Sequence, residues 1–251
     1  MVLDTERIAI ISDVHGNLTA LQAVLDHVRT SGITRIFNLG DLVGKGPRSA
    51  AVVDRCREAC EVTVQGNWDA EIAGGFEPAW AEGEWHREQL GTERLSYLAT
   101  LPGSFDFWLS GQLVRLFHAS SVSVHHRVYE TAARAEHEKM FHNTSFTGGD
   151  HPPTIVGYGD IHTAYALSFA GKTLFNAGSV GNALDLPLAC YVVLEGEYGG
   201  RNPASWSLKI VRLTYNVEVE IAIARASGMP KAEEYAVGLR TAVYRGRQPA
   251  R

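Results

Sequence analysis

The sequence predicts an α/β protein in which two packed, mixed β-sheets form a β-sandwich flanked by helices. The first third alternates short apolar runs with amphipathic stretches, which is typical of βαβ units with parallel strands. The later part adds several short β segments, enough for a second sheet. With 251 residues, of which 45% are hydrophobic and 20% charged, the chain can form one large buried core.

The first elements follow one another at short intervals. Apolar runs at residues 8–12, 35–39 and 62–64 predict three strands. Amphipathic stretches at residues 18–29 and 49–58 predict the helices between them. Strands joined in this way by helices pair in parallel.

A loop and a hairpin are expected next. Residues 74–92 are rich in Gly, Trp and acidic side chains, so we expect a loop that leads into a helix at about 85–99. Alternating residues at 105–109 and 113–117 surround Ser110-Gly111, which predicts a hairpin.

A cap-like insertion and a helical tail complete the predicted organisation. Residues 120–149 are polar and His-rich, with a helical stretch near 129–140. From Asn216 onward the sequence predicts two helices separated by Gly228-Met229-Pro230. The strands expected in between lie at 155–158, 164–169, 172–176, 190–194 and 207–213. We therefore expect a single domain over residues 1–251, with the insertion at about 120–150 and the tail from about 216.

Charge and hydropathy exclude several classes of partner. The formal net charge is -5 and no run of Lys or Arg is present, which disfavours bulk nucleic acid. A small phosphorylated substrate stays compatible, because a divalent cation would supply positive charge. The N-terminus lacks the features of a signal peptide, and no apolar run approaches the ~20 residues of a membrane helix. We expect a cytoplasmic protein without membrane association, either monomeric or homo-oligomeric.

Polar side chains follow five of the predicted strands at the point where each strand ends. Sites in parallel α/β sheets form just beyond the carboxyl ends of the strands, so these side chains should converge. Asp and Asn oxygens mixed with imidazoles suit Mn, Fe or Zn better than Ca or Mg. A lone Asp after a strand is more often a helix N-cap, and a lone His a surface residue, but unrelated caps would not select this donor set. The candidate metal ligands are Asp13, His15, Asp41, Asn67, His118, Asp160 and His162.

The order of these motifs resembles that of a known family. Asp13-x-His15, Gly40-Asp41, Gly66-Asn67-x-Asp69, His118 and Gly159-x-x-His162 are similar to the motifs of the calcineurin-like metallophosphoesterase superfamily. The segment 176–181 resembles its small bacterial and archaeal phosphodiesterase branch, and the likeness covers nearly the whole chain. The resemblance implies the calcineurin-like phosphoesterase fold and hydrolysis of phosphoesters by two-metal activation of water.

The resemblance also implies a distribution of the ligands over two divalent ions. One ion would lie on Asp13, His15 and His162 and the other on Asn67 and His118, with Asp41 bridging both. Manganese is the first candidate, and Fe, Zn, Ni or Mg are alternatives.

Two positions depart from the family pattern. Asp160 stands where the family's last motif has its first His, and it can ligate as a carboxylate. Trp68 stands where the family commonly has the His that protonates the leaving group, and an indole has no titrating group. We place the catalytic positions at Trp68 and Asp69 and expect reduced activity.

Some nearby residues are candidates for substrate binding. Gly16 and Asn17 follow the first ligand motif, and His126 and Arg127 follow ligand His118. A solvated loop surface is the alternative for His126 and Arg127. The expected function is hydrolysis of a small phosphodiester, phosphomonoester or nucleoside polyphosphate. The alternative is a catalytically weakened or non-catalytic scaffold of the same fold that serves protein interaction.

Overall fold

The computed structural model describes residues 4–75 and 80–244. Three predicted segments therefore lie partly outside the described residues: the N-terminal start (1–3), the centre of the 74–92 loop (76–79) and the end of the C-terminal tail (245–251). Within the described ranges, no helix is long and apolar enough to cross a membrane.

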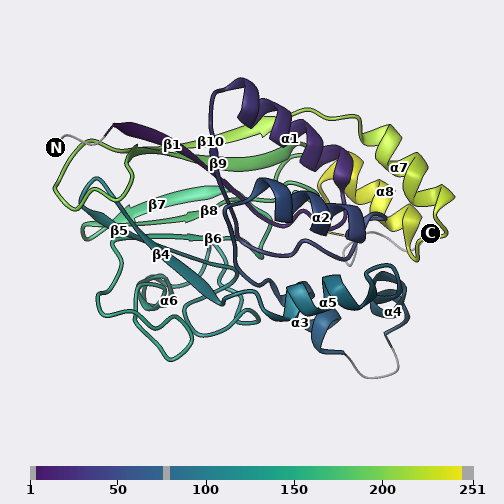
Figure 1. The fold of residues 1–251 in the computed structure, drawn as a ribbon, viewed down its shortest axis with the longest axis horizontal. Helices are drawn as coiled ribbons and strands as arrows, with labels where there is room; N and C mark the ends of the chain where they lie inside the picture. Colours follow the sequence, from purple (N-terminus) through teal and green to yellow (C-terminus); the bar gives the residue numbers. More distant parts are fainter. Residues whose placement is uncertain (1–3, 76–79, 245–251) are drawn as a thin grey trace.

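Two mixed five-stranded sheets pack face to face, as the sequence predicts (Figure 1). The first sheet has the order β10-β9-β1-β2-β3 and the second the order β4-β5-β6-β8-β7. The strands of the first sheet are β1 (Thr5–Ile11), β2 (Arg35–Asn38), β3 (Val62–Thr63), β9 (Ala189–Glu197) and β10 (Ser207–Leu213). Those of the second are β4 (Ser104–Leu109), β5 (Gln112–Phe117), β6 (Ile155–Tyr158), β7 (Tyr165–Phe169) and β8 (Lys172–Asn176).

The helices lie outside this sandwich. Helix α1 packs on β9 and on α7, while α3, α4 and α5 pack on one another at one end of the molecule (Figure 1). The helices are α1 (Leu18–Thr30), α2 (Ser49–Ala59), α3 (Asn67–Gly74), α4 (Ala81–Glu88), α5 (Gly91–Ala99), α6 (Arg134–Lys139), α7 (Val217–Ala226) and α8 (Ala232–Thr241).

The second half of strand β1 is buried on both faces of its sheet. Successive side chains of a strand point to opposite sides, so they enter two different cores. Ile8 and Ile10 enter the core between the two sheets, together with Phe37 and Phe175. Ala9 and Ile11 enter the core between the first sheet and the helices. The continuous apolar run of this strand thus places the residues that follow it deep in the molecule.

Parallel pairing sets the position of the functional site. Strand β1 pairs in parallel with β2, and β2 with β3. In the second sheet β5 pairs in parallel with β6. The carboxyl ends of these five strands therefore lie along one edge of the sandwich, and the candidate ligands follow them.

Two helix predictions were wrong in their bounds, and one helix was missed. The single helix expected at 85–99 is two helices: α4 ends at Glu88, and Gly91, the first residue of α5, has a φ of 68°, which interrupts a continuous helix. The helix expected near 129–140 is confined to α6, since side chains hold the backbone before it: Tyr158 Oη donates to Val128 O and His137 Nε2 to Tyr129 O. Helix α3 was not predicted.

Candidate metal centre

The candidate ligands lie on sharply turned backbone at the strand ends. Asp13, His15, Asp41, Asp160 and His162 all have φ between 46° and 65°, in the left-handed region. Asp is among the residues that tolerate this region best, yet each such position costs roughly 1–3 kcal/mol and occurs mainly at functional sites. Backbone hydrogen bonds between the loops stabilise this conformation: Asp13 N donates to Gly40 O and His15 N donates to Asp41 O.

Backbone carbonyls orient the three imidazoles. Nδ1 of His15 lies 2.9 Å from Val43 O, Nδ1 of His118 2.8 Å from Leu39 O, and Nδ1 of His162 2.5 Å from Asn182 O. A carbonyl can only accept, so each Nδ1 carries the proton. Nε2 of each ring therefore faces the cluster, which is the arrangement found for metal-ligating histidines.

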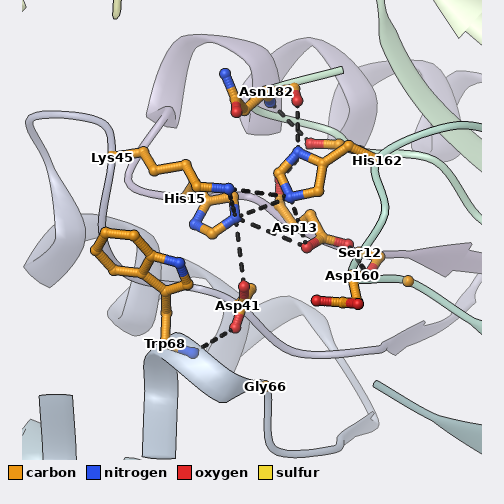
Figure 2. A network of polar contacts seen from close by, with 12 residues as sticks. Ser12, Asp13, His15, Asp41, Lys45, Gly66, Trp68, Asp160, His162 and Asn182 are labelled. Carbon is orange, nitrogen blue, oxygen red and sulfur yellow. Dashed lines mark hydrogen bonds and ion pairs between the residues drawn. The ribbon is translucent and has the colours of Figure 1, made fainter. Parts of the chain in front are cut away.

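These side chains form two overlapping groups that share Asp13. Figure 2 shows Asp13, His15, Asp41 and His162 turned toward one another. Asp13 Oδ1 lies 3.1 Å from His162 Nε2 and 3.7 Å from His15 Nε2. Asp41 Oδ2 lies 3.4 Å from His15 Nε2 and 3.5 Å from His118 Nε2. One group is thus Asp13, His15 and His162, and the other is Asp13, Asp41 and His118.

The donor set fits divalent ions. Oδ1 of Asp13 is buried and has no hydrogen-bond partner, although a buried carboxylate oxygen is costly when unpaired. Asp13, His15, Asp41 and His118 are all almost completely buried, so two carboxylates and several imidazoles meet in one place shielded from water. Mixed nitrogen and oxygen donors of this kind suit Mn, Fe or Zn.

Burial and mutual contact shift the pKa values of the cluster. Burial acts to raise the pKa of Asp13, but His162, His118 and His15 together hold it below its ordinary value. Burial raises the pKa of Asp41, and the neighbouring carboxylates of Asp13 and Asp69 add to this effect. The pKa values of the two buried carboxyl groups are thus shifted in opposite directions.

Lys45 is a site residue that the sequence analysis missed. Its Nζ lies 2.9 Å from His15 Nε2 and 3.1 Å from His162 Nε2 (Figure 2). Burial and then the ammonium group of Lys45 lower the pKa of both imidazoles, which keeps them neutral acceptors. Its place between two glycines, four residues after ligand Asp41, is a signal that could have identified it.

Asn67 and Asp69 lie at the start of α3. Asn67 Oδ1 lies 3.0 Å from His118 Nε2, so the structure brings these two predicted ligands together. The carboxylate of Asp69 accepts from Asp41 N, Leu42 N and Gly66 N at 2.8, 3.0 and 3.1 Å. Asp69 therefore fastens α3 to the loop that carries Asp41.

Trp68 forms a wall beside the cluster. Its backbone N–H donates to Asp41 Oδ1 at 2.8 Å, and its ring lies 5.8 Å from that of His15 and 4.9 Å from that of Trp80. A Cβ on Gly44 would lie 2.0 Å from the Trp68 ring, so the indole lies directly over this glycine.

Asp160 is paired with Arg127. The guanidinium approaches the carboxylate through Nε (2.7 Å) and Nη2 (2.6 Å), while Asp160 Oδ1 lies 3.9 Å from His118 Nε2. Asp160 belongs to neither of the close ligand groups. The predicted ligand thus lies at the edge of the cluster, and its role as a ligand stays a prediction.

The remaining predicted substrate residues lie in different surroundings. Asn17 caps α1 and donates to Gly181 O and Tyr215 Oη, so protein groups engage its amide. Gly16 has a φ of 64° and packs so tightly that a Cβ would lie 2.5 Å from Gly46 O. His126 is exposed. Substrate binding by these three residues stays a prediction.

A cavity of about 840 Å³ opens beside the cluster. Its lining includes Lys45, Trp68, Arg127, Tyr129, Asp160 and His162. The volume is in the range of small-molecule sites. Positive and aromatic side chains thus face the same space as the edge of the candidate metal centre.

The family of this chain follows from the comparison with known domains. The calcineurin-like phosphoesterase superfamily domain matches residues 7–199, which contain every candidate ligand. The chain belongs to the calcineurin-like phosphoesterase superfamily.

Individual relatives support the placement in the calcineurin-like phosphoesterases. The chain is 29% identical over 228 residues to the uncharacterized protein MJ0912 of Methanocaldococcus jannaschii, covering 84% of this chain and 88% of the relative. It resembles the crystal structure of a metallophosphoesterase from Sphaerobacter thermophilus with a TM-score of 0.75 and 25% identity, over 96% of this chain and 100% of that one. A shorter match, 35% identical over 71 residues, is to the phosphodiesterase YfcE of Escherichia coli, covering 24% and 39% of the two chains.

Proposed function

We propose that this protein hydrolyses a small phosphodiester, phosphomonoester or nucleoside polyphosphate with the help of two divalent metal ions, Mn first among the candidates. The observation that carries the proposal is the convergence of Asp13, His15, Asp41, His118 and His162 with each Nε2 turned inward. Membership of the phosphoesterase superfamily supports the hydrolase class.

The ligand side chains would divide between the two ions. The first group, Asp13, His15 and His162, would hold one ion, and Asp41, Asn67 and His118 would complete the site of the other. When bound, such ions lower the pKa of water toward ~7 and balance the charge of a phosphoryl group. The left-handed backbone at the strand ends keeps the side chains oriented before substrate arrives.

Trp68 cannot act as a general acid, because an indole has no group that titrates near neutral pH. A positioned general acid contributes about 100- to 10,000-fold to a rate, so a leaving group that needs a proton is at a disadvantage here. Substrates whose leaving group departs as a stable anion, such as aryl esters or phosphoric anhydrides, are favoured. The indole instead lies beside the His15 ring and would shield that side of the imidazole from water.

A hydrolysis assay tests the proposal. Protein loaded with Mn²⁺ should cleave bis(p-nitrophenyl) phosphate or p-nitrophenyl phosphate, and an alkyl ester such as glycerol phosphate much more slowly. Asp41→Asn is the control, because it keeps the volume of the side chain and removes its charge. Equal traces of hydrolysis in the wild type and Asp41→Asn would refute a metal-dependent hydrolase.

A non-catalytic scaffold is the second candidate function. Trp68 and Asp160 favour it, since both stand where the family pattern has a His, and Asp160 is paired with Arg127. A scaffold should still bind metal without turning over either nitrophenyl ester. Hydrolysis by protein whose metal content has been measured separates the two functions, because both candidates bind metal and the hydrolase alone turns over the esters.

A further inference from the structure

The Arg127 guanidinium lies between the candidate metal centre and the cavity. One Arg127 nitrogen, Nη2, is 2.6 Å from Asp160 Oδ1, and that oxygen is 3.9 Å from His118 Nε2. Asp160 is almost fully buried, whereas the side chain of Arg127 is 47% exposed and lines the cavity. The Asp160 carboxylate therefore separates the guanidinium from the predicted ligand His118, and the guanidinium faces the cavity that substrate would enter.

Asp160 engages only one edge of the guanidinium. The pair uses Nε–H and one N–H of Nη2, while an arginine carries five N–H donors. Three donors, two on Nη1 and one on Nη2, are outside this bidentate pair. The Tyr129 side chain, which lines the same cavity, also forms a hydrogen bond with the guanidinium, so two donors remain for a ligand when Tyr129 engages one. Planar donors of this kind match the oxygens of phosphate.

The backbone on both sides of the pair is anchored independently. Val128 is buried and its carbonyl accepts from Tyr158 Oη at 2.8 Å. On the other side, Asp160 N donates to Asp13 Oδ2 at 3.1 Å, which fixes the backbone of Asp160 to the cluster. The loop does not depend on the ion pair alone to keep its place, so the pair is suited to present a donor group to a ligand.

We propose that Arg127, oriented by Asp160, binds the phosphoryl oxygens of the substrate beside the metal centre. Asp160 is then a positioning residue that holds the guanidinium. This inference rests on the proposed site for metal and phosphoester, and it assigns a role to the residue, Asp160, that stands where the family pattern has a His. The ligand class is a phosphoryl group with at least one unesterified oxygen.

Equilibrium binding tests the inference without turnover. The probe is inorganic phosphate, titrated calorimetrically into the Mn²⁺-loaded full chain. Arg127→Gln should weaken phosphate binding about 10- to 100-fold, the range for losing a charged hydrogen-bond donor. Arg127→Lys should recover part of the affinity, since it keeps the charge and loses the fork. Metal content should match that of the wild type in both variants, while the melting temperature of Arg127→Gln should fall because the buried Asp160 carboxylate loses its partner.

Two further variants identify what the pair does. Arg134→Gln is the matched control: it removes an exposed arginine of the same insertion that pairs with Glu138, and it should leave phosphate binding unchanged. Asp160→Asn should weaken phosphate binding less than Arg127→Gln does and keep both metal ions.

Three outcomes would overturn the inference. Unchanged phosphate affinity in Arg127→Gln is the first, and absence of phosphate binding by the metal-loaded wild type is the second. The third is loss of one metal ion in Asp160→Asn but not in Arg127→Gln, because Asp160 would then be a ligand and Arg127 its counter-ion. A wild type that binds phosphate but hydrolyses nothing would refute the proposed hydrolase and leave this inference standing.

Discussion

Lys45 introduces a positive charge among buried carboxylates. Its ammonium group contacts the same Nε2 atoms of His15 and His162 that the first metal ion would need. A cation already present there balances the charge of Asp13 and Asp41, and an incoming ion has to displace it or be repelled by it. The side chain thus stabilises the metal-free protein at the expense of metal affinity.

Lys45→Met should therefore raise the affinity for metal and lower the stability of the metal-free protein. We expect Mn²⁺ to bind the Asp13, His15 and His162 group about tenfold more tightly or better, since one unit of repulsion is removed at short range. The melting temperature of the chelator-treated variant should fall. Calorimetric titration and thermal unfolding measure the two effects, with Lys139→Met at the exposed Glu136 pair as control. Weaker metal binding in Lys45→Met would contradict this account.

His118 makes the stability of the metal-free protein depend on pH. Burial acts to lower its pKa, but Asp41 and Asp13 outweigh this and raise it to about 9, from an ordinary value of 6.5. A raised pKa stabilises the folded state fully below pH 6.5, and the contribution is lost as pH rises through 9. Metal binding must remove the same proton, so its affinity should rise over that window.

Urea unfolding of chelator-treated protein at a series of pH values checks this expectation. The unfolding free energy should fall between about pH 6.5 and 9. His118→Gln removes the titrating group and should flatten the profile. An unfolding free energy that rises over this interval in the wild type would show that the carboxylates do not hold a proton on His118.

At the scale of elements, the close approach of two loops decides the geometry of the site. A Cβ on Gly66 would lie 2.2 Å from both the backbone N and Oδ1 of Asp41. The φ of Gly66 is −91°, which any residue adopts, so the requirement for glycine is one of space. The end of β3 can approach the end of β2 only where this side chain is absent.

Gly66→Ala should destabilise the protein by about 3 kcal/mol, near the upper end for overpacking. It should also weaken metal binding, because the added methyl group pushes against Asp41. Gly74→Ala, at the far end of α3, is the control: no atom lies within 4 Å of its Cβ position. Urea unfolding and metal titration report the two effects, and equal behaviour of the two variants would rule out the steric argument.

How well the sequence predicted each element depended on whether the signal was local. The strand ends and the ligand types were predictable, because the apolar runs before Asp13, Asp41 and His118 are visible in the sequence. Helix α3 was missed because it is stabilised from a distance: Asp69 accepts from Asp41 N and Leu42 N, 28 and 27 residues away. The pairing of Asp160 with Arg127 spans 33 residues and had no local signal either.

At the scale of the whole molecule, the C-terminal helices support the loop that carries Lys45. Glu220 in α7 is fully buried, accepts from Thr19 Oγ1 and pairs with Arg48. Arg48 N in turn donates to Gly16 O at 3.0 Å. The tail thus connects to Arg48, at the α2 end of the loop that carries Lys45, and through Arg48 to the turn after His15.

Glu220→Ala should lower the unfolding free energy by about 3 kcal/mol, because it removes one partner of a buried pair. Glu218→Ala is the control, since Glu218 pairs with Arg240 in solvent, and its unfolding should match the wild type. If the tail supports the loop, Glu220→Ala should also weaken phosphate binding. If Glu220→Ala lowers stability but binds phosphate as tightly as the wild type, the tail stabilises the fold without supporting the site.

The ligands come from both sheets of the sandwich. Asp13, His15 and Asp41 follow strands of the first sheet, whereas His118 and His162 follow strands of the second. An ion held by both sets would cross-link the two sheets, so metal binding should slow the opening motions that separate them. Amide hydrogen exchange should accordingly be slower in β1 and β6 when Mn²⁺ is bound, and faster again after chelation. Exchange unaffected by metal in both strands would mean that the layers stay closed without it.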